Sequence, residues 1–189
     1  YDMYGRVVRQ CCLDTEGKPM LYVNGAYYGT VKYDAYGQVK ELRAFNEQEQ
    51  PMCTSDGWAA QINDYDDKLR LVRVRNYNEK DELCLNKEGW AGCNCTYDSF
   101  GNEVERIYIG IDAAPRLISL GFAGVRKEYD SRGREVKRMY LNEDGQPCLH
   151  KDGYAGVLSE YNAQGNEVNR VYLGVDGQPC QHKSENKQQ

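Results

Sequence analysis

The chain has 189 residues, of which 24 are Lys or Arg and 29 are Asp or Glu, and its net charge is −5. Charges of both signs are interspersed without a basic block, which argues against a nucleic-acid partner or an anionic membrane surface. No stretch approaches the roughly 18 to 20 apolar residues that a membrane-spanning helix needs, so membrane insertion is not expected. Because the chain has 16 Tyr, 2 Trp and 3 Phe, we expect aromatic side chains to replace a missing aliphatic core.

The chain is built from a repeat of 32 residues that begins with a Tyr-Asp or Tyr-Asn pair and has no insertion or deletion. The repeats begin at Tyr1, Tyr33, Tyr65, Tyr97, Tyr129 and Tyr161. We therefore expect one repeat domain over 1–189, with repeats at 1–32, 33–64, 65–96, 97–128 and 129–160 and a truncated one at 161–189. Since the chain begins within a motif and without an initiator Met, we interpret it as a piece of a longer protein.

Three turn motifs divide the repeat. The first is D-x-x-G, as at 130–133, in which an Asp opens a type I turn and the Gly accepts a left-handed backbone. A second motif lies near the middle, as at 14–17, and a third ends in a late Gly such as Gly25. Helical repeats have similar periods, but no useful helix fits between turns so closely spaced. Leu69 stands where the third repeat should have its first Gly, so we expect a different turn there.

The segments between the turns are rich in β-branched and aromatic residues and predict strands. Residues 103–109, with their equivalents 135–141 and 167–173, form one strand per repeat, and 123–129 represents a second. Residues 147–150 suggest a third, short strand. We predict an all-β, elongated repeat array of antiparallel hairpins, in a β-meander, spiral or solenoid-like form. An open array and a closed solenoid both remain possible at this point.

The eight cysteines allow a disulfide framework, but their positions favour reduced thiols. A framework disulfide should recur once per repeat, and only Cys84, Cys148 and Cys180 share a column, which elsewhere holds Met20, Met52 and Arg116. Bacterial cell-surface, secreted and cytoplasmic locations all remain open.

Two consecutive repeats share the sequence Cys-x-His, at Cys148 with His150 and at Cys180 with His182. Residues two apart on a strand share a face, so stacked repeats would bring two thiols and two imidazoles together as a zinc-like set. The alternative, which we favour, is that these residues are diverged copies of an apolar column. No other cofactor is expected.

A column of aromatic residues follows the late Gly of the repeat and is the candidate ligand-binding surface. Its members are Trp58, Trp90, Phe122 and Tyr154. Exposed aromatic rings at regular spacing can stack on sugar rings, because a flat rigid ring loses little entropy on binding. The alternative is that they form core. For the tyrosines of the Tyr-Asp pairs we favour core.

The repeat resembles the Tyr-Asp (YD, Rhs-type) repeats of bacterial surface and toxin proteins, through motifs such as Tyr97-Asp98 with Gly101 and Tyr129-Asp130 with Gly133. It has a weaker likeness to MORN-type hairpin repeats. The first resemblance implies an extended β architecture and an association with carbohydrate or surface contexts. It implies no catalytic residue.

An enzymatic site is hard to assemble, because the two histidines, His150 and His182, occupy one repeat position. We predict that the chain is not an enzyme but a β-repeat binding module of a larger bacterial protein, recognising glycan or cell-surface polymer. The alternative is a structural spacer or a protein-protein interaction scaffold. The partner is thus a glycan or a protein, and the oligomeric state is left open.

Overall fold

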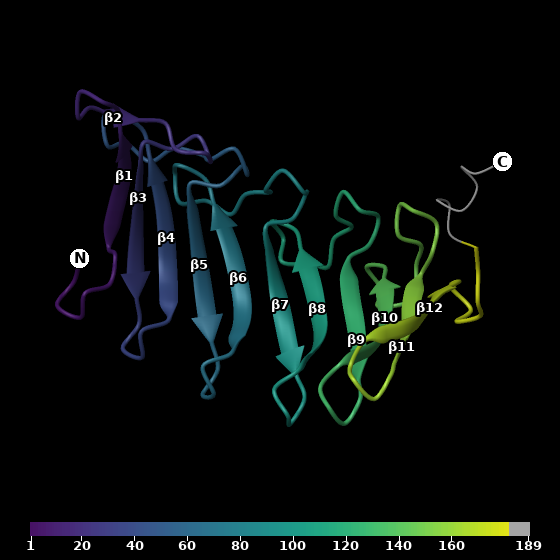
Figure 1. Ribbon diagram of the computed structural model, residues 1–189. Helices are drawn as coiled ribbons and strands as arrows, with labels where there is room; N and C mark the ends of the chain where they lie inside the picture. Colours follow the sequence, from purple (N-terminus) through teal and green to yellow (C-terminus); the bar gives the residue numbers. More distant parts are fainter. Residues whose placement is uncertain (182–189) are drawn as a thin grey trace. The chain divides into compact units, whose positions relative to one another are not determined.

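The computed structural model describes residues 1–181, and these residues form strands and turns without a helix (Figure 1). The prediction of an all-β array of antiparallel hairpins is confirmed. Accordingly, residues 1–181 hold no helix that is long and apolar enough to span a membrane. The strands are β1 Arg9–Leu13, β2 Pro19–Met20, β3 Tyr28–Tyr33, β4 Val39–Phe45, β5 Ala60–Tyr65, β6 Leu71–Tyr77, β7 Gly92–Tyr97, β8 Glu103–Ile109, β9 Gly124–Tyr129, β10 Glu135–Leu141, β11 Gly156–Tyr161 and β12 Glu167–Leu173.

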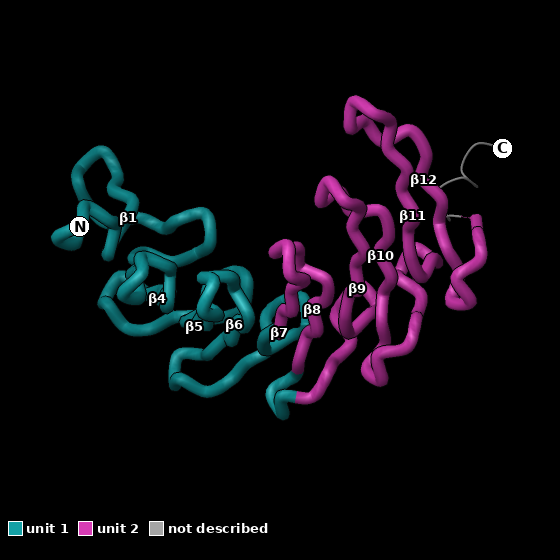
Figure 2. Tube along the Cα trace, turned by 90° about the horizontal axis from the view of Figure 1, so that it is seen from below, with its two compact units in different colours: residues 1–93, 110–113 teal, residues 94–109, 114–189 magenta. Residues whose placement is uncertain are grey.

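The chain divides into two compact units, shown in Figure 2. Unit 1 comprises residues 1–93 and 110–113, and its strands pair antiparallel in the order β2-β1-β3-β4-β5-β6. Unit 2 comprises 94–109 and 114–189, and within it β8-β9-β10-β11-β12 pair antiparallel in chain order. Apart from β3, which pairs with β1 and not with β2, each of these strands pairs with its neighbours in sequence, as short hairpin connections require.

The D-x-x-G turns have the predicted geometry. In the turn between β9 and β10, the Gly133 amide donates to the Asp130 carbonyl at 3.0 Å, and the Asp130 amide donates to the Arg134 carbonyl at 3.0 Å. The Asp130 carboxylate also accepts from the amides of Arg132 at 2.9 Å and Arg134 at 3.0 Å. Gly133 has a φ of 74°, a conformation in which a side chain is unfavourable.

The expectation of a different turn at Leu69 is wrong. Leu69 adopts a φ of 61° and its amide donates to the Asp66 carbonyl at 3.0 Å, as a Gly does elsewhere. The Asp66 carboxylate accepts from the amides of Lys68 and Arg70, both at 2.9 Å. These bonds hold the loop in the shape of the other repeats, so the leucine backbone takes the strained conformation. The turn is therefore fixed by the Asp as much as by the Gly.

The prediction of a short third strand at residues 147–150 is also wrong. Pro147 makes a single isolated bridge with Leu141, and the equivalent prolines at 51, 115 and 179 do the same. Only in the first repeat does this segment form a strand, the two-residue β2. Leu83, which stands in place of the proline in the third repeat, also makes a single bridge, to Tyr77, so the missing amide proton of proline does not by itself limit the pairing.

The core is made of small and aliphatic residues more than of aromatics, contrary to expectation. Its fully or almost fully buried members include an alanine column, with one alanine in each of the second to fifth repeats. They also include an aliphatic column at the end of the second strand of each hairpin in unit 2. These are Ala59, Ala91, Ala123 and Ala155, and Ile109, Leu141 and Leu173. The glycine after each of the last three alanines lies so close to its neighbouring strand that a Cβ cannot fit. At Gly156 it would overlap the Arg138 carbonyl oxygen and the Met139 sulfur.

Candidate functional site: repeated cavities in unit 2

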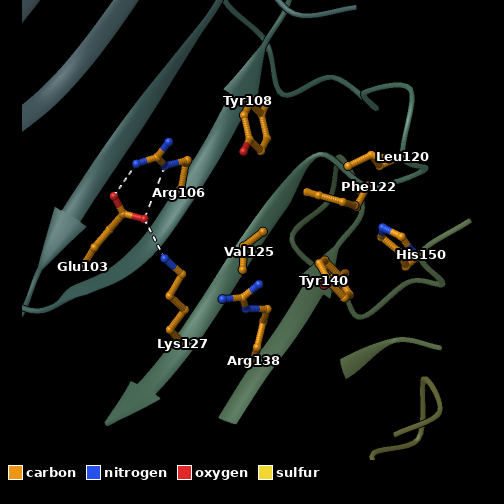
Figure 3. A pocket seen from close by; sticks show the side chains of 10 residues that line it. All are labelled: Glu103, Arg106, Tyr108, Leu120, Phe122, Val125, Lys127, Arg138, Tyr140 and His150. Carbon is orange, nitrogen blue, oxygen red and sulfur yellow. Dashed lines mark hydrogen bonds and ion pairs between the residues drawn. The ribbon is translucent and has the colours of Figure 1, made fainter. Parts of the chain in front are cut away.

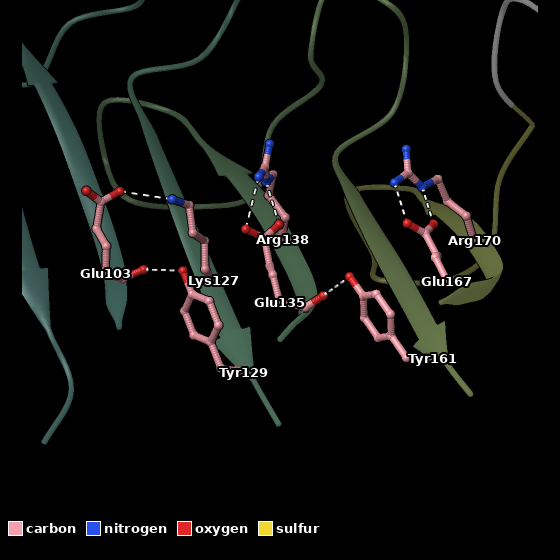
Figure 4. Close-up of polar contacts among 8 residues, drawn as sticks. All are labelled: Glu103, Lys127, Tyr129, Glu135, Arg138, Tyr161, Glu167 and Arg170. Atoms are coloured by element: carbon pink, nitrogen blue, oxygen red, sulfur yellow. Dashed lines mark hydrogen bonds and ion pairs between the residues drawn. The ribbon is translucent and has the colours of Figure 1, made fainter. Parts of the chain in front are cut away.

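The tyrosines of the Tyr-Asp pairs join successive repeats. The Tyr129 hydroxyl donates to the Glu103 carbonyl at 2.9 Å, and the Tyr161 hydroxyl donates to the Glu135 carbonyl at 3.0 Å (Figure 4). Unit 1 has the same bond from Tyr33 to the Val7 carbonyl at 3.0 Å. Each bond spans 26 residues. These half-buried tyrosines therefore have a structural role.

Beside these bonds, a glutamate and an arginine three residues apart form a bidentate ion pair on one strand. On β10, Arg138 Nε and Nη2 donate to the Glu135 carboxylate at 2.8 and 3.0 Å. On β12, Arg170 donates to Glu167 through the same atoms at 2.6 and 2.7 Å. Figure 4 shows both pairs. The repeat thus places one guanidinium group at the same position of successive hairpins.

A bulge explains how these residues meet, because residues three apart on a regular strand point to opposite faces. In the β9–β10 ladder, Glu135 lies opposite Tyr129, whereas Lys137 lies opposite Glu128. One extra residue therefore stands on β10 between these two pairs, and it turns Glu135 and Arg138 to the same face. The same register shift occurs between β11 and β12, at Glu160 and Tyr161.

The first cavity of unit 2 has a volume of about 340 Å³ and lies over β8, β9 and β10 (Figure 3). Its lining residues are Glu103, Arg106, Tyr108, Leu120, Phe122, Val125, Lys127, Arg138, Tyr140 and His150. Glu103 accepts from Arg106 Nη2 at 2.6 Å and from Lys127 Nζ at 2.9 Å. Arg106 and Lys127 thus share Glu103, whereas Arg138 is paired with Glu135, so these contacts hold three cationic groups and two carboxylates. This excess of positive charge favours an anionic group.

The electrostatics of this cavity keep its groups charged. Burial alone would raise the pKa of Glu103, but hydrogen bonds from Arg106 and Lys127, and their positive charge, hold the pKa below its ordinary value. The hydrogen bond to Glu135 raises the pKa of Arg138 against the opposing effect of burial. The carboxylate and the guanidinium are therefore both ionised near neutral pH.

A second cavity repeats the first in the following repeat. It has a volume of about 350 Å³ and is lined by Glu135, Arg138, Tyr140, Tyr154, Val157, Ser159, Tyr161, Arg170 and Tyr172. Most of these residues are the repeat equivalents of residues that line the first cavity, 32 positions earlier. Arg138 and Tyr140 line both cavities. The two cavities are therefore neighbours in a row.

The predicted aromatic column is divided among three cavities. Trp58 and Trp90, both half-buried, line a cavity of about 330 Å³ in unit 1, together with Asp56, Gln61, Asn86, Lys87 and Glu88. There Lys87 pairs with Asp56 at 2.8 Å, and Trp90 Nε1 donates to Glu88 at 3.1 Å. The structure thus brings the two tryptophans to one polar cavity.

The other two members of the column lie in unit 2. Phe122 is only 4% exposed and packs against Tyr140 at a ring-centroid distance of 4.7 Å. Tyr154 packs edge-on against Tyr172 at 4.8 Å, and burial raises the pKa of its hydroxyl to about 12. Phe122 lines the first cavity and Tyr154 the second.

The sequence interpretation missed the charged residues that line these two cavities. A signal was present, because Glu-x-x-Arg recurs at 103–106, 135–138 and 167–170. The bulge brings the Glu and the Arg of this motif to one face of the sheet. The regular alternation of side chains along a strand does not predict a bulge.

The proposed zinc ligands fall partly outside the described residues, because His182 lies beyond residue 181. His150 is buried and its ring stacks on Phe122 at 5.7 Å and on Tyr154 at 5.3 Å. Its Nδ1 accepts from the Asp152 amide at 3.2 Å. Burial raises the pKa of the Cys148 thiol.

Within residues 1–181, no group of three or more His, Cys, Asp and Glu is arranged to hold a metal ion. The four-ligand set therefore stays a prediction. None of the eight cysteines, which all lie in the described part of the chain, forms a disulfide.

No family model and no curated protein matches the chain. Among solved structures, the chain is similar to toxin-complex proteins. One is a mutant Tc holotoxin pore of Photorhabdus luminescens, at 13% identity and a TM-score of 0.45, and another is a TcdB2-TccC3-Cdc42 complex, at 12% and 0.44. Each match covers 92% of this chain, which spans only 9% of the matched chain. At this identity and TM-score, the likeness assigns neither a family nor an activity to the chain.

Proposed function

We propose that this chain is a non-catalytic β-repeat module that binds a protein partner through the two cavities of unit 2. The observation that carries the proposal is their recurrence in the register of the repeat, with Arg138 and Tyr140 common to both. A catalytic centre requires one repeat to differ from the others, whereas a row of equivalent cavities suits an extended ligand that crosses successive repeats. The rigid hairpins and the paired side chains pre-organise this surface, which reduces the entropy lost on binding.

Site-specific photo-cross-linking tests this function. A photoreactive amino acid at Ser159, which lines the second cavity, should cross-link a specific protein in extracts of the source cells. The same group at Glu143, an exposed turn residue outside both cavities, is the control. Mass spectrometry should identify one protein from the Ser159 sample alone, and the purified protein should bind the chain. Equal cross-linking from both positions, or none from Ser159, would refute the proposal.

A glycan ligand is a second candidate, favoured by the cavity of unit 1. Two half-buried indoles beside amide, carboxylate and ammonium groups offer ring faces and hydrogen bonds for a saccharide. A glycan array should then show binding that is lost in Trp58→Ala/Trp90→Ala. Phe100→Ala, which changes a ring that is 90% exposed in a turn of unit 2, is the matched control. Binding unaffected by the double substitution would remove this cavity from the account.

A further inference from the structure

The charges of the first cavity point to an acidic ligand. Arg106, Lys127 and Arg138 line it, and Glu103 is its one lining carboxylate. Glu135, the partner of Arg138, lines the second cavity and not the first. A guanidinium group has five N–H donors, and Glu135 takes one on Nε and one on Nη2 of Arg138, so Arg138 is suited to hold a carboxylate of a ligand as well as that of Glu135.

The aromatic rings of this cavity favour a peptide over a saccharide. Phe122 is 4% exposed and Tyr140 is 7% exposed, and their rings pack on each other. A pyranose ring needs an open aromatic face for stacking, and these faces are covered by other side chains. Besides the half-buried Tyr108, the groups that reach a ligand are therefore the charged ends of the side chains.

The spacing of the two cavities sets the spacing of the ligand groups. Equivalent residues of the cavities lie two strands apart, from β8 to β10 and from β10 to β12. Neighbouring strands are about 4.8 Å apart, which gives about 9.6 Å between equivalent positions. A polyproline II helix rises about 9.3 Å in three residues, which form one turn. Residues i and i+3 of such a peptide therefore face the same way at nearly the same interval.

We propose that the row of cavities in unit 2 binds an acidic segment in the polyproline II conformation. This proposal rests on the proposed function, in which the ligand is a protein. The carboxylates of the segment stand at positions i and i+3 and contact the guanidinium groups of successive repeats. Unit 1 does not share this property. At the positions equivalent to Arg106, Arg138 and Arg170 it has Gln10, Leu42 and Val74.

Fluorescence anisotropy with the complete chain and labelled synthetic peptides tests the proposal. A proline-rich peptide with glutamates at i and i+3 should bind, and its affinity should fall as salt is added. A peptide with glutamines at these positions, or with glutamates at i and i+2, should bind at least about tenfold more weakly.

Two double variants separate recognition from stability. Glu135→Gln/Arg138→Gln removes a pair that lines the cavities without leaving a charge unpaired, and it should weaken binding at least about tenfold. Glu105→Gln/Arg126→Gln removes a pair held at 2.7 Å between β8 and β9. Arg126 alternates with the cavity residues Val125 and Lys127, so its side chain points to the other face. This variant should bind as the wild type does. Thermal unfolding of each variant shows whether it is folded.

Several outcomes would overturn the inference. These are equal affinity of the glutamate and glutamine peptides, equal loss in both double variants, or binding of a uronic-acid oligosaccharide but of no peptide. If the i and i+3 peptide fails to bind while Ser159 still cross-links a protein partner, the inference falls and the proposed function stands.

Discussion

The Tyr129 hydroxyl donates a hydrogen bond of 2.9 Å to the carbonyl of Glu103, a residue whose carboxylate holds Arg106 and Lys127 in the first cavity. The residue that opens the repeat thus fixes the backbone position from which a cavity side chain projects. The same relationship links Tyr161 to Glu135 in the next repeat. The Tyr-Asp pair therefore connects hairpins as well as opening turns.

Tyr129→Phe removes this bond and leaves the ring in place. We expect a loss of about 1 kcal/mol in the free energy of unfolding, the usual net contribution of one hydrogen bond. Tyr36→Phe is the control, because the Tyr36 side chain is 76% exposed in a turn. Urea denaturation of both variants measures the difference. Identical stability of Tyr129→Phe and wild type would show that the bond does not join the repeats energetically.

Leu69→Gly should stabilise the chain by roughly 0.5–1 kcal/mol, because a left-handed backbone costs a side-chain-bearing residue about 1–2 kcal/mol. Part of that gain is offset by the greater freedom of Gly in the unfolded chain. Leu69 is 38% exposed, so the loss of its remaining packing also limits the gain. The midpoint of urea unfolding provides the measurement. A lower midpoint would mean that the leucine side chain contributes more than its backbone strain costs.

Gly156→Ala tests the close approach of β10 and β11. The added methyl group would overlap the Arg138 carbonyl oxygen, which belongs to the backbone and has little room to move. We expect a loss of about 1–3 kcal/mol, typical of overpacking. Gly145→Ala is not a suitable control, because Gly145 has a positive φ of 75°. Ser159→Ala, a small change on the same strand, serves instead. Full stability of Gly156→Ala would contradict the spacing of these strands.

The turns and strands were readable from the sequence because each rests on a local rule. Glycine with positive φ marked the D-x-x-G turns, and the predicted strands 103–109, 135–141 and 167–173 coincide with β8, β10 and β12. Leu69 was misjudged because the Asp66 hydrogen bonds override the preference of the fourth residue. The ion pair of Glu135 with Arg138 was missed because alternation places them on opposite faces until the bulge is known.

Stability should depend on the ionisation of Glu103. Its pKa in the folded chain lies below the ordinary value of 4.5, so its ion pairs stabilise the fold above that pH. This contribution is lost as the pH falls through the folded-state pKa. Wild type should therefore be more stable than Glu103→Gln at pH 7, and the difference should shrink as the pH falls through the folded-state pKa of Glu103. Urea unfolding over a series of pH values from 7 downward supplies the comparison. A constant difference would exclude Glu103 as the titrating group.

The proposed binding of a protein partner through the cavities of unit 2 can be measured on two matched variants. Isothermal titration calorimetry gives the affinity of each variant for the partner that cross-links at Ser159. We expect Glu135→Gln/Arg138→Gln, which changes residues lining the cavities, to weaken binding at least about tenfold, and Glu105→Gln/Arg126→Gln to bind as wild type does. Wild-type affinity in the first variant, with both proteins folded, would contradict the claim.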